Sequence, residues 1–117
     1  MVFESPETQP DLSTPAARAR YRIRAALKLI EEIRVAAESG ARPQAIAARS
    51  RLESTFDEIE FAIYEHICER KIHEEDYSRA VHNERFISEQ LANAEALARV
   101  TIAAARAQGV DFEAPNA

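Results

Sequence analysis

Residues Ala45 to Gln108 contain neither glycine nor proline, an uninterrupted run that leaves few folds open to this chain. Turns between strands draw on glycine and proline, so this run favours helices over sheets. Globular helices rarely exceed about 25 residues outside coiled coils and membrane spans, so we expect a break inside the run. We place the break between Ile72 and Asp76, where three consecutive acids suit the first turn of a new helix.

The first predicted helix covers residues 14–39. Ser13 or Thr14 suits the N-cap, and Pro15 suits the first helical position. Gly40 suits the position just after the helix end. Small and aliphatic residues recur in steps of three and four, which predicts one face packed against partner helices. These residues are Ala16, Ala19, Ile23, Ala26, Ile30, Ile33 and Ala37.

The second predicted helix covers residues 43–72 and the third covers residues 76–108. On the second helix we expect one row to face the core and an adjacent apolar row to need a further neighbour. The core row is Leu52, Phe56, Ile59, Ile63 and Ile67, and the adjacent row is Phe61, Tyr64, Cys68 and Ile72. We expect the third helix to be the longest and to overhang the others. Its main row is Ala80, Ile87, Leu91, Ala94, Ala98, Thr101 and Ala105, and its flank is Phe86, Leu97, Val100 and Ala104.

These patterns together predict an all-α protein, an antiparallel three-helix bundle. Residues 14–108 form its one domain, between a flexible N-terminal arm of residues 1–13 and a flexible C-terminal tail of residues 109–117. Alanine makes up much of the predicted core and buries little area per side chain. We therefore expect self-association, most simply as a homodimer, to complete the bundle.

Composition narrows the classes of function. The net charge of −5 disfavours nonspecific binding of nucleic acid, and no stretch approaches the roughly 20 apolar residues that a membrane span requires. One cysteine and an acidic, proline-containing N-terminus predict a reducing, cytoplasmic setting. Arginine outnumbers lysine 13 to 2 and alanine occurs 23 times, a usage typical of GC-rich bacterial genomes.

Residues Tyr64 to His82 contain all three histidines and the only cysteine, Cys68. If the helix continues through this segment, four potential zinc or iron ligands share one face. They are His66, Glu69, His73 and Asp76. The glutamate that di-iron bundles place three residues before a histidine is absent, so we favour polar residues at a solvated helix junction and expect no metal or cofactor. In its apolar row, Cys68 is predicted to be a small buried residue.

A basic block on the first helix contains no acid and is the candidate nucleic-acid site. It consists of Arg18, Arg20, Arg22, Arg24 and Lys28. Nine acids between Leu52 and Asp76 offer the opposite charge, so the favoured interpretation is an ion-paired face between the first two helices.

The sequence contains no phosphate-cradling loop, nucleophile elbow or paired CxxC motif, which disfavours an enzyme. The favoured hypothesis is a noncatalytic helical interaction or assembly module, a homo-oligomeric adaptor that also binds another protein. Its predicted interaction residues are Phe61, Tyr64, Phe86, Leu97 and Val100. A metal-binding bundle and a nucleic-acid-handling adaptor remain the alternatives.

Overall fold

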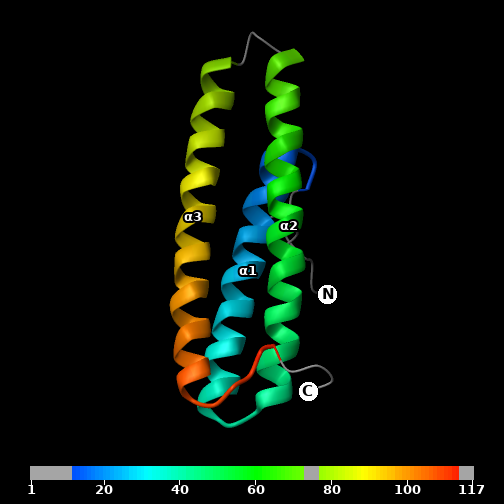
Figure 1. Ribbon diagram of the computed structural model, residues 1–117. Helices are drawn as coiled ribbons and strands as arrows, with labels where there is room; N and C mark the ends of the chain where they lie inside the picture. The colour runs from blue at the N-terminus through cyan, green and yellow to red at the C-terminus, as the bar shows by residue number, and fades with distance from the viewer. Residues whose placement is uncertain (1–11, 73–76, 114–117) are drawn as a thin grey trace, which may run out of the picture.

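The computed structural model describes residues 12–72 and 77–113, and only the backbone for residues 69–72, 77–81 and 83. This part of the chain folds into three α-helices without a strand: α1 (Pro15–Glu38), α2 (Arg42–Ile72) and α3 (Tyr77–Ala107). Each predicted helix boundary lies within one residue of the observed one, and the predicted break separates α2 from α3. Figure 1 shows α1 packed against both α2 and α3, with helices that follow one another in the chain antiparallel and α1 parallel to α3. The predicted all-α three-helix bundle is confirmed.

Helices α2 and α3 extend together beyond the N-terminal end of α1 (Figure 1). Each contains 31 residues, whereas α1 contains 24. The expectation that the third helix is the longest is therefore wrong, because α2 has the same length and shares the overhang. The difference of seven residues corresponds to about 10 Å of helix.

Local hydrogen bonds fix where α1 begins and where α1 and α3 end. The backbone N–H of Ala17 donates to Thr14 Oγ1 at 3.1 Å, so Thr14 is the N-cap and Pro15 follows it. Beyond each C-terminus, a glycine adopts positive φ, 78° at Gly40 and 100° at Gly109. The next residue returns a backbone hydrogen bond to the last turn, from Ala41 N to Ala36 O and from Val110 N to Ala105 O. Both ends are thus Schellman motifs, which satisfy carbonyl groups that the helix leaves unpaired.

The core lies along one row of alternating three- and four-residue steps on each helix. All seven predicted core residues of α1 are buried, as are all those of α3 except Ala80, whose side chain lies outside the described part. Alanine supplies much of this interior, so the helix backbones can approach closely. Within the described residues, no helix has an apolar stretch of the length needed to cross a membrane.

The core row of α2 differs from the predicted one. Leu52 and Ile59 are buried as expected, but Phe56, Ile63 and Ile67 are only half-buried at the edge of the core. The buried row is Ala45, Ala48, Leu52, Ile59, Ala62 and His66. The prediction followed the largest aliphatic side chains, whereas close packing placed alanine against the neighbouring helices and moved the large residues to the flank.

The chain after α3 packs onto the bundle instead of leaving it. Val110 and Phe112 are buried members of the hydrophobic core, 3% and 7% exposed. This corrects the predicted flexible tail of residues 109–117, because the packed part of the chain extends at least to Phe112. Residues 114–117 and residues 1–11 of the predicted arm lie outside the described part.

Candidate interaction surface

The five predicted interaction residues are all at the surface. On α2, Phe61 is 62% exposed and Tyr64 is 64% exposed. On α3, Phe86 and Leu97 are each 47% exposed and Val100 is 68% exposed. Isolated exposed apolar residues are ordinary on soluble proteins, so only their arrangement carries information.

On α3 the exposed apolar residues belong to a regular second row, which we call the outer row. Its members recur in steps of four and three, and each directly precedes a residue of the buried row on the same helix. They are Phe86, Gln90, Asn93, Leu97, Val100 and Ala104. Gln90 is half-buried and the other five are exposed, and none of the six carries a charge. Sequence reasoning found four of these residues but missed Gln90 and Asn93, although the spacing already pointed to them.

On α2 the exposed apolar residues lie beside charged ones. Phe61 borders a shallow groove of about 410 Å³ together with both members of two ion pairs between α1 and α2. In these pairs Arg18 lies 3.6 Å from Glu65, and Arg22 lies 3.3 Å from Glu58. An aromatic side chain with a charged rim resembles the anchor of a protein interface.

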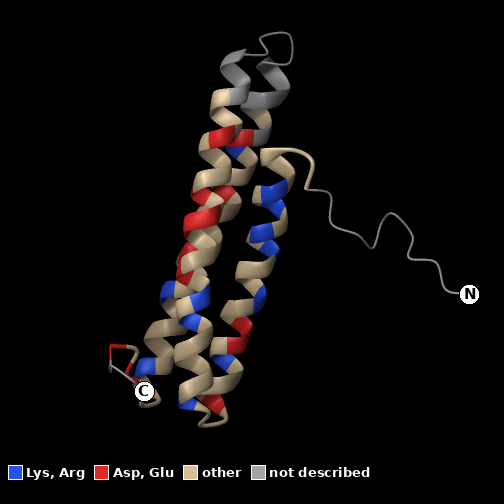
Figure 2. Ribbon diagram, turned by 90° about the vertical axis from the view of Figure 1, so that its right-hand side faces the viewer, with Lys and Arg blue, Asp and Glu red and all other residues tan. Residues whose placement is uncertain are grey.

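The basic block of α1 is divided between two roles. Figure 2 shows its blue residues along the N-terminal half of α1, next to a helix that carries red acidic residues. Arg18 and Arg22 form the ion pairs with α2 that the charge pattern predicts. Arg20, Arg24 and Lys28 form no ion pair within the described part of the chain. Only these three remain as candidates for binding a phosphate backbone.

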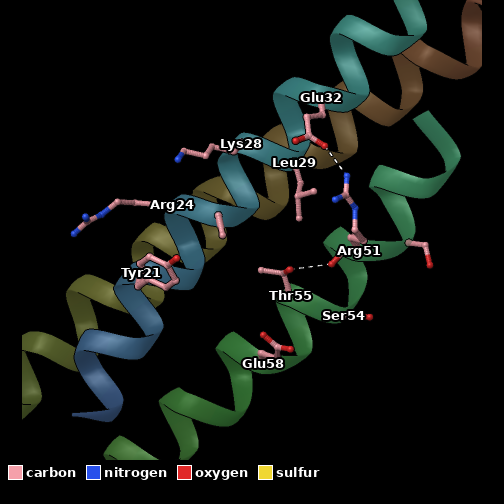
Figure 3. Close-up of a pocket in the computed structure, with 11 residues that line it drawn as sticks. Tyr21, Arg24, Lys28, Leu29, Glu32, Arg51, Ser54, Thr55 and Glu58 are labelled. Atoms are coloured by element: carbon pink, nitrogen blue, oxygen red, sulfur yellow. Dashed lines mark hydrogen bonds and ion pairs between the residues drawn. The ribbon is translucent and has the colours of Figure 1, made fainter. Parts of the chain in front are cut away.

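A larger groove of about 660 Å³ lies between α1 and α2 (Figure 3). Leu29 projects into it from α1, while Arg24 and Lys28 extend away from α2. At one end Arg51 donates to the Glu32 carboxylate at 2.7 Å, which links the two helices. The groove is lined by two acids, Glu32 and Glu58, and each carboxylate is paired with an arginine. No histidine or cysteine is among the described residues that line it. The groove offers binding contacts and not an acid–base pair.

The structure describes the side chain of one of the four candidate metal ligands, His66. His66 is 8% exposed and belongs to the buried row of α2, which corrects its predicted place at a solvated junction. The side chains of Glu69, His73 and Asp76 lie outside the described residues. Among the side chains that are described, no group of three histidine, cysteine or acidic residues is arranged to hold a metal ion. The zinc or iron site stays a prediction.

Cys68 is exposed, which contradicts the prediction of a buried thiol. It follows Phe61 and Tyr64 on the same face of α2, at steps of three and four residues. Sequence reasoning assumed that a neighbouring helix covers this apolar row. No described helix covers it, so the thiol and both aromatic rings face solvent.

Comparison with known proteins gives no relative from which a role transfers. Neither the family models nor the curated proteins nor the solved structures contain a match to this chain. Its function has to be argued from its own residues.

Proposed function

We propose that this chain is a noncatalytic helical interaction module that associates with a second copy of itself and presents a further helical face to another protein. The observation that carries this proposal is the uncharged outer row of α3. In a chain whose residues are 30% charged, six residues at regular helical spacing are all without charge, and five of them are exposed. Such a row is the pattern that helices use to pack against a partner helix.

The face for another protein is the aromatic face of α2, formed by Phe61, Tyr64 and Cys68. Aromatic side chains supply much of the energy at protein interfaces, and surrounding polar groups exclude water from them. The two ion pairs beside Phe61 are placed to act as such a rim. Helical faces of this kind dock into grooves or beside helices of partner proteins.

Light scattering on the purified full chain tests the self-association. The proposal predicts a mass that rises with concentration from 13.1 kDa towards twice that value. A mass of 13.1 kDa at every concentration would contradict the proposed self-association and therefore the proposed homo-oligomeric adaptor.

A second candidate, a nucleic-acid-handling adaptor, is favoured by one observation. Arg20, Arg24 and Lys28 recur at four-residue steps without an ion-pair partner in the described part, so about 6 Å of helix separates one cation from the next. Fluorescence anisotropy with labelled DNA and RNA distinguishes the candidates. Binding that weakens steeply with salt and is reduced by Arg24→Gln, but not by Arg106→Gln on α3, would favour this adaptor.

A further inference from the structure

We infer that two copies of this chain associate through antiparallel α3 helices, each outer row packing against the same row of the other copy. This inference rests on the proposed self-association and adds its surface and orientation. The outer row extends over about 27 Å of helix, from Phe86 to Ala104. In a dimer with two-fold symmetry, the same surface of each copy forms the contact. For antiparallel helices, the outer row must therefore be complementary to the same row in reverse order.

The order of residues in the outer row meets this requirement. When two such rows run antiparallel about position 95, Phe86 faces the partner's Ala104, and Ala104 faces the partner's Phe86. A large side chain therefore meets a small one at both ends of the contact. In a parallel pair, Phe86 would face its own copy while the alanines at the other end left a gap. In the antiparallel pair, facing side chains fill similar volumes along the whole contact. Because interfaces pack as densely as protein interiors, this favours the antiparallel orientation.

The middle of the row contains its two amides. In the antiparallel pair Gln90 faces the partner's Val100, and Asn93 faces the partner's Leu97. Each amide therefore lies opposite an apolar side chain, and a polar residue in an apolar seam costs stability. Two amides in a row of six make the association weaker than that of a fully apolar seam.

Substitutions on α3 test the surface. Leu97→Glu places two charges in the centre of the contact, and we expect loss of the dimer in light scattering. Ala92→Glu introduces the same side chain at an exposed position of α3 outside the outer row and is expected to leave the dimer unchanged. Val100→Glu provides a second disruptive variant at a 68% exposed site, and circular dichroism confirms that each variant keeps its helices. A helical Leu97→Glu or Val100→Glu variant that still dimerises would exclude this surface while leaving the proposed self-association intact.

Disulfide exchange tests the orientation. Chains carrying Cys68→Ser with either Gln90→Cys or Val100→Cys are mixed in a glutathione buffer that permits exchange. The antiparallel pair predicts that the mixed disulfide between the two variants predominates over both homodisulfides. Predominance of the homodisulfides would overturn the antiparallel orientation. A monomeric wild-type chain at every concentration would instead overturn the proposed self-association itself.

Discussion

The guanidinium carbon of Arg49 on α2 lies 5.8 Å from the centre of the Phe112 ring, which follows the end of α3. Arg106 on α3 approaches the same ring, with its guanidinium carbon 5.9 Å from the ring centre. Cations at this distance from an aromatic face are attracted to it. Phe112 thus connects the end of α3 to α2 and closes the core at the end of the bundle that contains Gly40.

Replacing this aromatic side chain should destabilise the protein. We expect Phe112→Ala to lower the free energy of unfolding by about 3 kcal/mol, because a buried ring is lost and a cavity remains. Glu113→Ala, which removes an exposed ion pair with Arg106, should change it by less than about 0.5 kcal/mol. Urea denaturation followed by circular dichroism measures both. Equal, small effects would show that the segment after Gly109 contributes little to the core.

Two adjacent alanines on α2 provide a test of the close packing. Ala48 is 1% exposed, whereas Ala47 is exposed. We expect Ala48→Leu to cost about 1–3 kcal/mol, because the larger side chain forces α2 away from its neighbours. Ala47→Leu should stay within about 0.5 kcal/mol of the wild type. Thermal or urea unfolding checks the pair, and a stabilised Ala48→Leu variant would show that the alanine core is underpacked.

The carboxyl of Glu31 should titrate at unusually low pH. Hydrogen bonds from Arg34 hold the pKa of Glu31 below its ordinary value. Because the pKa is lower in the folded chain than in the unfolded one, the Glu31–Arg34 interaction stabilises the protein above the ordinary glutamate pKa, and that contribution is lost as the pH falls through the folded pKa.

Carboxyl chemical shifts in an NMR titration measure this pKa directly. Arg34→Gln should raise the Glu31 pKa towards its ordinary value, whereas Arg106→Gln, on another helix, should not move it. An unchanged Glu31 pKa in the Arg34→Gln variant would contradict the assigned cause.

The Cys68 thiol should react in the folded protein. Because its side chain is exposed, we expect a thiol reagent such as dithionitrobenzoate to label it without denaturant, at a rate close to that of the urea-unfolded chain. Cys68→Ser serves as the blank. Labelling that begins only when urea unfolds the chain would show that the thiol is covered in the folded protein and would contradict its exposure.

Helix positions followed from the sequence because they depend on neighbours a few residues away. Pro15, Gly40 and Gly109 mark helix ends through backbone conformation and capping hydrogen bonds, and the structure places the ends beside them. The core rows of α1 and α3 were also predictable, since small and apolar residues recur along each of them mainly in steps of three and four. Local chemistry was sufficient in each case.

The tertiary structure alone decided which side of α2 is buried. Phe56, Ile63 and Ile67 are more apolar than His66, yet they lie at the flank while His66 lies inside. The exposure of Cys68 and the burial of Phe112 have the same origin. Burial depends on where distant segments lie, and here alanine contacts between helices set those positions. Periodicity within one helix therefore identified apolar rows, but only the packed bundle determined which row it covers and which it leaves for a partner.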